Sequence, residues 1–291
     1  MTLAVVLGAG GERVIAWETG VLAGLADAGI DLRGGDAVLG TSAGSLIAAR
    51  LALGFDPRDD ARRHSARRPS PSHPEGVDGA TAFAAFADVW RECGTTLQER
   101  RRAMGALALQ QGRDEDASAD EIRWIARRLG EVERWPGALR IAVVDAEQGR
   151  RRILGAHAGV DLARAVAASR AIPVLRPAVR AGGAWCVDGA LGSATNADAL
   201  LDLPAGTAVV ITAAADARRG GLDALWADAL AQEAARLRGA GWHVVLVAAG
   251  ADDHRAMGPD PLLAADPPAA VAAGRRRGRV AALEVGAAAP A

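Results

Sequence analysis

The chain alternates short apolar runs with longer segments whose apolar residues recur at helical spacing. Residues 3–7 form a continuous apolar run, and residues 15–28 follow as a helical pattern that ends at a glycine. A second apolar run at 37–39 precedes a second helical pattern at 45–53. Continuous apolar runs of this length are typical of strands buried on both faces, as in parallel sheets. The first fifty residues therefore predict two strand–helix units.

The same alternation continues through the rest of the chain. Five more strands are expected, at 139–144, 152–154, 184–187, 208–212 and 244–247, with a hairpin between the first two and helical patterns elsewhere along the chain. Strands that alternate with helices indicate an α/β domain of three α/β/α layers with a mostly parallel central sheet. Neither an internal repeat nor a change of composition marks a domain boundary, so we expect a single domain over residues 1–291.

Two consecutive segments interrupt this alternation. The segment at about 55–80 is rich in Pro and Arg, and this composition predicts a solvated loop, or a lid beside a site, and excludes a core helix or strand. The next segment, at about 81–130, predicts a helical insert. Its aromatic residues Phe83, Phe86 and Trp90 lie at helical spacing, and we expect them to pack together.

Composition narrows the class of protein. Half of the residues are apolar and the net charge is −1, so a sizeable core is expected and nothing indicates a nucleic-acid partner. The two cysteines, Cys93 and Cys186, have no metal-ligand spacing and form no disulfide framework. The chain start lacks a basic signal-peptide region, and no apolar stretch is long enough to span a bilayer. These features predict a cytoplasmic protein.

Residues 40–44, Gly-Thr-Ser-Ala-Gly, match the pattern G-x-S-x-G between the second strand and the second helix. This strand–turn–helix is the context of a nucleophile elbow, in which a strained turn projects a serine hydroxyl toward the substrate. Gly40 and Gly44 would allow the backbone to approach itself closely around Ser42. The alternative is a turn of small residues without a catalytic role, because glycine and alanine are abundant in this chain.

The glycine-rich turn after the first strand has three possible interpretations. A dinucleotide fingerprint, G-x-G-x-x-G, fits Gly8 and Gly10, but its third position is Arg13 and the second strand ends in Gly40, where an acidic ribose ligand is expected. An oxyanion loop also needs consecutive glycines, since their amides can face a site without side-chain obstruction. A serine elbow on the next strand favours the oxyanion loop. A tight turn without a ligand remains the third interpretation.

A serine nucleophile needs a base, and the chain offers two kinds. His254 follows the last predicted strand, which would complete the order Ser, Asp, His of α/β-hydrolases. However, the usual elbow of those enzymes comes later than the second strand. Asp188 ends a predicted strand, and Gly189 after it would let the chain turn and bring the carboxylate into a site. An Asp-Gly pair is also common in simple turns.

Three of these motifs, in this order, resemble those of the patatin-like phospholipases. Residues 9–14 are similar to the family's glycine-rich loop G-G-G-x-R-G, residues 40–44 to its elbow and residues 188–190 to its D-G-G or D-G-A motif. The stretches at 168–173 and 195–198 also resemble the regions before and after the family's aspartate. The resemblance covers roughly residues 3–198.

The resemblance implies a hydrolase of lipid acyl esters that uses a Ser–Asp dyad and no histidine. Ser42 would be the nucleophile, Asp188 the base, and the amides of Gly10 and Gly11 would hold the oxyanion. The supporting motif positions are Gly8, Arg13, Gly40, Gly44 and Gly189. The chain departs from the loop pattern at two glycine positions, which are occupied by Ala9 and Val14.

We therefore expect a patatin-like serine esterase that needs neither a metal ion nor an organic cofactor. Its partners would be a lipid or another acyl ester and, transiently, a membrane surface. Two alternatives stay open: a Ser-His-Asp esterase that uses His254, and a non-catalytic lipid- or nucleotide-binding module.

Overall fold

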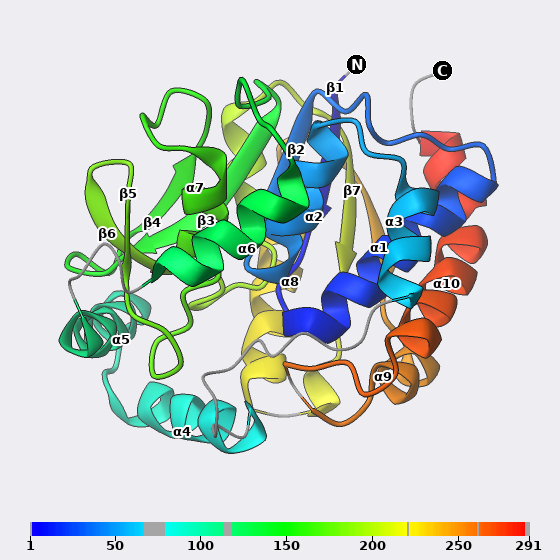
Figure 1. Cartoon of the computed structure of the whole chain (residues 1–291). Helices are drawn as coiled ribbons and strands as arrows, with labels where there is room; N and C mark the ends of the chain where they lie inside the picture. The colour runs from blue at the N-terminus through cyan, green and yellow to red at the C-terminus, as the bar shows by residue number, and fades with distance from the viewer. Residues whose placement is uncertain (1, 67–78, 113–117, 220, 261, 289–291) are drawn as a thin grey trace.

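The computed structural model describes residues 2–66, 79–112, 118–219, 221–260 and 262–288 (Figure 1). Within these ranges one sheet contains the strands β1 (Thr2–Leu7), β2 (Ala37–Thr41), β3 (Leu139–Asp145), β4 (Arg151–Leu154), β5 (Val179–Ala181), β6 (Ala184–Asp188), β7 (Gly206–Thr212) and β8 (His243–Ala248). Their order is β5-β6-β3-β2-β1-β7-β8, and β4 also pairs with β3.

The sheet is parallel from β3 to β8 and antiparallel at its other end. β1 pairs in parallel with β2 and β7, while β6 runs antiparallel to β3 and to β5. The register of β6 places Asp188 opposite Val143, and Ala142 next to it pairs with Thr41 of β2. The end of β6 is therefore level with the end of β2.

Helices cover both faces of the sheet, and this confirms the α/β/α prediction (Figure 1). The helices of the described chain are α1 (Gly11–Asp27), α2 (Ala43–Ala52), α3 (Pro57–Ser65), α4 (Gly79–Glu92), α5 (Leu97–Gln111), α6 (Ala119–Leu129), α7 (Leu162–Ser169), α8 (Gly221–Gly239), α9 (Ala251–Met257) and α10 (Pro267–Ala288), with short 3-10 turns η2 (Ala197–Asp202) and η3 (Ala217–Arg219).

The core follows from the alternation of side chains along the strands. Leu3, Val5 and Leu7 of β1 point to the face covered by α1, α2, α6, α7 and α10. Ala4 and Val6 point to the opposite face, which α8 and η2 cover. Both faces are buried, which explains the continuous apolar runs in the sequence.

The segment predicted as a Pro/Arg-rich loop is partly helical, so the prediction was wrong for residues 57–65. Asp56 is the N-cap of α3 and accepts a hydrogen bond from the Arg58 amide, and Pro57 occupies the first turn, where its missing N–H costs nothing. Asp60 forms a buried ion pair with Arg50 of α2. The rest of the predicted loop, residues 67–78, lies outside the described residues.

The segment predicted as a helical insert contains α4, α5 and α6. Phe83 stacks on Phe86 with ring centroids 5.8 Å apart, and Phe86 stacks on Trp90 at 6.4 Å. These aromatics pack together, as expected. Within the described ranges, no helix combines the length and apolar character needed to cross a lipid bilayer.

Candidate active site

Ser42 lies in a strained turn between the end of β2 and the start of α2. Its backbone has φ 52° and ψ −117°, a conformation that costs a non-glycine residue about 1–3 kcal/mol. A Cβ atom at Gly40 would lie 2.5 Å from the Cα of Ser45, and one at Gly44 would lie 2.3 Å from the carbonyl oxygen of Leu7. The two glycines are therefore needed for this turn, and the sequence interpretation of a nucleophile-elbow geometry matches the structure.

The Ser42 hydroxyl donates a hydrogen bond to Oδ2 of Asp188, at an Oγ–Oδ2 distance of 2.7 Å. The two residues come from distant parts of the sequence and meet because β6 ends level with β2. Oδ1 of Asp188 accepts a hydrogen bond of 2.8 Å from the Ala190 amide, which orients the carboxylate. The structure thus brings together the two residues that the sequence named as nucleophile and base.

Burial changes the acidity of Asp188, which is only 1% exposed. Loss of solvation raises the pKa of its carboxyl from 3.8 to about 6, although the hydrogen bonds from the Ala190 amide and the Ser42 hydroxyl favour the ionised form. Arg170 and Arg176 also lower this pKa through their positive charge. A carboxylate with a pKa near 6 is ionised at neutral pH and is a stronger base than an exposed aspartate.

Gly10 and Gly11 line the same cavity as Ser42 and Asp188. Gly11 has φ 73°, and a Cβ atom there would lie 2.5 Å from the Leu262 carbonyl oxygen. Gly10 has φ 148°, and a Cβ atom there would lie 2.3 Å from a methyl group of Val14. Both positions therefore require glycine.

The two departures from the family's loop pattern are accommodated within the fold. Helix α1 begins at Gly11, four residues earlier than the sequence predicted, so Val14 belongs to its first turn. The Val14 side chain is fully buried in the core and packs beside Gly10. Ala9 is also buried, and its amide donates a hydrogen bond of 2.9 Å to the Ala194 carbonyl.

Gly8 connects the glycine-rich turn to the serine turn. Its carbonyl accepts a hydrogen bond of 3.0 Å from the Gly44 amide, and its own amide donates to Oε1 of Glu18 at 2.7 Å and to the Ile211 carbonyl at 3.1 Å. Glu18 is fully buried, and burial raises the pKa of its carboxyl well above 4.5. Glu18 was not predicted from the sequence as a residue of the site. Its signal is a single acidic residue in the mainly apolar stretch 14–26.

Two further motif positions, Arg13 and Gly189, lie next to the site. Arg13 is buried, lines the cavity and donates a hydrogen bond to the Gly258 carbonyl at 3.4 Å. A Cβ atom at Gly189 would lie 2.2 Å from the Ala142 carbonyl oxygen. Only glycine therefore allows the backbone at this position to lie so close to β3. Both motif positions therefore have a structural reason for their residue type.

The cavity in front of Ser42 has a volume of about 270 Å³ and is mainly apolar. Its apolar lining includes Phe83, Phe86, Ile172, Leu191, Trp226 and Leu262. Such a cavity suits a hydrocarbon group. Among the described side chains, no group of three or more His, Cys, Asp or Glu residues lies close enough together to hold a metal ion.

His254, the alternative base, lies in α9 after β8 and does not line this cavity. Two strands, β1 and β7, separate β8 from β2 in the sheet. Adjacent strands are spaced about 4.8 Å apart, so β8 lies roughly 14 Å from the strand that carries Ser42. The structure therefore places His254 beyond a different strand from Ser42 and outside the cavity that Ser42 lines.

Comparisons with known proteins give one family match. The model of the family described as patatin-like phospholipase matches residues 5–201. A search of curated proteins found no match.

Solved structures show distant similarity to this chain. The type III effector ExoU is 15% identical, with 97% of this chain and 53% of that chain covered and a TM-score of 0.40. VipD from Legionella pneumophila is 14% identical, with 97% and 66% covered and a TM-score of 0.43. The complex of SpcU with ExoU from Pseudomonas aeruginosa gives 15% identity, 98% and 52% coverage and a TM-score of 0.41. The chain thus spans between about half and two thirds of the length of these proteins.

The family match includes both strand–helix units, the serine turn and Asp188, and it ends within η2. It covers more than half of the chain, and the three motifs lie inside it in the family's order. The chain therefore belongs to the patatin-like phospholipases, a family of lipid acyl hydrolases.

Proposed function

We propose that this protein hydrolyses acyl esters of lipids, with Ser42 as the nucleophile and Asp188 as the base. The observation that carries the proposal is the 2.7 Å hydrogen bond from the Ser42 hydroxyl to Asp188 at the wall of an apolar cavity. Family membership supports the substrate class. The apolar lining suits an acyl chain, and a lipid substrate implies transient contact with a membrane surface.

The reaction would proceed through an acyl-enzyme. Ser42 Oγ attacks the ester carbonyl carbon while its proton passes to Asp188, and the resulting oxyanion is held by the amides of Gly10 and Gly11. The intermediate collapses and expels the alcohol, which takes the proton from Asp188. Asp188 then accepts a proton from water as that water attacks the acyl group. The carboxylic acid leaves, and the proton returns to Ser42 Oγ.

The two cysteines are consistent with a location in a reducing compartment such as the cytoplasm. Cys93 and Cys186 form no disulfide bond. Burial raises the pKa of the Cys186 thiol to about 11, which keeps this thiol protonated and unreactive. We propose no role for either cysteine in the reaction.

Covalent labelling tests the proposal directly. A fluorophosphonate probe should phosphonylate the protein with release of fluoride, in parallel with loss of esterase activity, and mass spectrometry should locate the label on Ser42. A protein that hydrolyses esters but carries the label elsewhere would require a different nucleophile. Binding of lipid without turnover or labelling would favour a non-catalytic module.

The pH dependence of the reaction should follow the ionisation of Asp188. The base must be unprotonated to accept the serine proton, so kcat/KM should be low in acid and rise with a midpoint near pH 6, where burial places the pKa of Asp188. The measurement is kcat/KM for a neutral short-chain ester across acidic and neutral pH. A midpoint near the ordinary aspartate pKa would contradict a buried carboxylate base.

A side chain at Gly11 should displace the proposed oxyanion donors. In Gly11→Val the new Cβ would overlap the Leu262 carbonyl, and the φ of 73° would be unfavourable for valine. Loss of one oxyanion donor typically lowers kcat by about 100- to 1,000-fold. Steady-state kinetics of Gly11→Val should show this loss.

The matched control for this variant is Gly34→Val. Gly34 is exposed, and a Cβ atom there would meet no atom within 4 Å. The Gly34→Val variant should keep the wild-type kcat. A fully active Gly11→Val protein would reduce the glycine-rich turn to a structural role.

A further inference from the structure

Ser42 and Asp188 are 146 positions apart in the sequence, yet their side chains lie 2.7 Å apart. The serine turn carries backbone strain, and the segment after Asp188 leaves the sheet as a loop. Strained turns persist only where surrounding contacts hold them in place. Polar groups that take no part in the proposed reaction contact both segments.

Ser169, at the end of α7, connects the two segments on one side. Its Oγ accepts a hydrogen bond of 2.8 Å from the Ser42 amide and donates one of 2.7 Å to the Ala142 carbonyl. Its own carbonyl accepts a bond of 3.3 Å from the Gly189 amide. Ser169 is fully buried, so water cannot replace these partners. One residue thus holds both the backbone of the nucleophile and the residue after the base.

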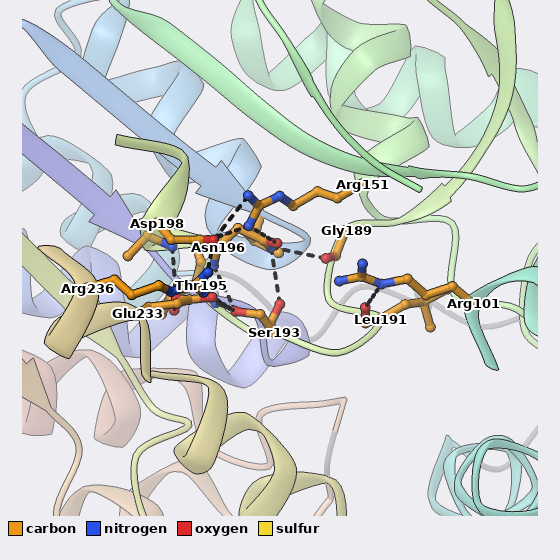
Figure 2. A network of polar contacts seen from close by, with 12 residues as sticks. Arg101, Arg151, Gly189, Leu191, Ser193, Thr195, Asn196, Asp198, Glu233 and Arg236 are labelled. Carbon is orange, nitrogen blue, oxygen red and sulfur yellow. Dashed lines mark hydrogen bonds and ion pairs between the residues drawn. The ribbon is translucent and has the colours of Figure 1, made fainter. Parts of the chain in front are cut away.

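Asn196 also contacts both segments. Figure 2 shows its contacts with Gly189 and Ser193, in the loop that follows Asp188. Its Nδ2 donates to the carbonyls of Gly189 and Ser193, each at 3.1 Å, and to Oγ1 of Thr41 at 3.2 Å. The Thr41 hydroxyl in turn donates to the Thr195 carbonyl at 3.3 Å. Thr41 immediately precedes the nucleophile, and Gly189 immediately follows the base. The amide of Asn196 therefore joins the two segments through three acceptors.

A buried carboxyl group fixes the loop that carries Asn196. Glu233 of α8 accepts hydrogen bonds of 2.6 Å from the hydroxyls of Ser193 and Thr195 and one of 2.9 Å from the Ala197 amide (Figure 2). Asn196 itself has the left-handed conformation, with φ 51°, which asparagine tolerates better than most residues. The loop is thus anchored to a helix on the opposite side of the sheet from α7.

We propose that Ser169 and Asn196 are positioning residues that hold the Ser42 turn and the Asp188 loop in register from opposite sides. The inference rests on the proposed function, because it assigns the two residues to the alignment of a Ser–Asp pair. Neither side chain lines the cavity, so neither contacts the substrate. Their effect is on the Oγ–Oδ2 geometry alone.

This role predicts a distinct kinetic signature. Reactions that depend on alignment lose about 100-fold in rate for a 1 Å misplacement of the reacting groups. Substrate binding depends on the apolar lining, which these residues do not contribute. A weaker alignment should therefore lower kcat and leave KM nearly unchanged. It should also raise the pKa of Asp188 further, since the Ser42 hydroxyl stabilises the ionised carboxylate through its hydrogen bond.

The test uses Thr41→Val and Ser169→Ala in the full chain. Thr41→Val removes one acceptor of the Asn196 bridge without changing the left-handed residue, and Ser169→Ala removes the acceptor of the Ser42 amide. Each should lower kcat roughly ten- to a hundred-fold, keep KM within about twofold and move the acidic midpoint of kcat/KM to higher pH. The rate of fluorophosphonate labelling should fall in parallel.

Two controls separate alignment from stability. Thr41→Ser keeps the hydroxyl and should restore most of the activity and the original pH midpoint. Thr207→Val removes an equally buried hydroxyl, which donates to the Ala288 carbonyl at 2.7 Å at the opposite end of β7 from the site. It should lower the melting temperature without changing kcat or the pH profile.

The inference is overturned if folded Thr41→Val and Ser169→Ala keep the wild-type kcat and pH midpoint, or if Thr207→Val loses as much activity as they do. Failure of the proposed function would look different. In that case Ser42→Ala would retain turnover, whereas failure of the inference alone leaves Ser42 essential and the bridge variants fully active.

Discussion

Ser42→Ala is expected to lose essentially all ester hydrolysis while keeping the fold. The substitution removes the hydroxyl that would attack the carbonyl, and no neighbouring group lies in the same position to replace it. Removal of the serine nucleophile of a hydrolase costs about 10⁶-fold in kcat. Steady-state hydrolysis of a short-chain ester, with circular dichroism of the same preparation, measures both parts of the prediction.

The fold should survive because the change is small. Alanine has the same backbone restrictions as serine at a φ of 52°, and the backbone N–H of residue 42 can still donate its hydrogen bond to Ser169 Oγ. Ser118→Ala is a suitable control, since Ser118 is also buried but its side chain makes no capping hydrogen bond to α6. It should be fully active. Near wild-type turnover in folded Ser42→Ala would remove Ser42 as the nucleophile.

The serine turn could be predicted from sequence because its determinants are local. A buried strand, two glycines around Ser42 and a helical pattern all lie within twenty residues. Local backbone sterics then decide the conformation, and the structure matches it. The strand–helix alternation likewise predicts the α/β/α layers, because a strand that is buried on both faces of a sheet has a continuous apolar sequence.

Helix α3 was missed for a different reason. The composition of the segment, rich in proline and arginine, was interpreted as a whole, whereas the helix depends on one local signal. Asp56 followed by Pro57 is an N-cap and first-turn pair, and a mainly polar helix can still be held by the ion pair of Asp60 with Arg50. Position-specific capping signals therefore outweighed average polarity here.

Long-range partners could not be derived from sequence patterns alone. The choice between Asp188 and His254 depends on the antiparallel register of β6, which pairs Asp188 with Val143. No local pattern in the sequence specifies that pairing. The bridges made by Ser169 and Asn196 are hidden for the same reason, since each residue type is common in turns and at helix ends. Their contacts become visible only when the strands are aligned.

Asp188→Asn is expected to reduce turnover by several orders of magnitude, whereas His254→Ala should keep most of the activity. Asparagine retains the shape of the side chain and can still accept a hydrogen bond from the Ala190 amide, but it cannot take the serine proton at neutral pH. His254 lies outside the cavity that contains Ser42. Matched, folded preparations of both variants should be compared by kcat and by the rate of fluorophosphonate labelling.

The same substitution should stabilise the protein at neutral pH, which separates loss of the base from loss of the fold. The folded-state pKa of Asp188 is raised from 3.8 to about 6, so its contribution to stability is complete below the unfolded value and is lost as the pH rises through 6. At one pKa unit per 1.36 kcal/mol, ionisation of the buried carboxyl costs roughly 3 kcal/mol or less at pH 7. Asp188→Asn avoids this cost. Denaturant unfolding should therefore show that the free energy of unfolding of the variant, relative to wild type, increases from acidic to neutral pH. An active Asp188→Asn beside an inactive, folded His254→Ala would instead make His254 the base and move the protein to a Ser-His-Asp mechanism.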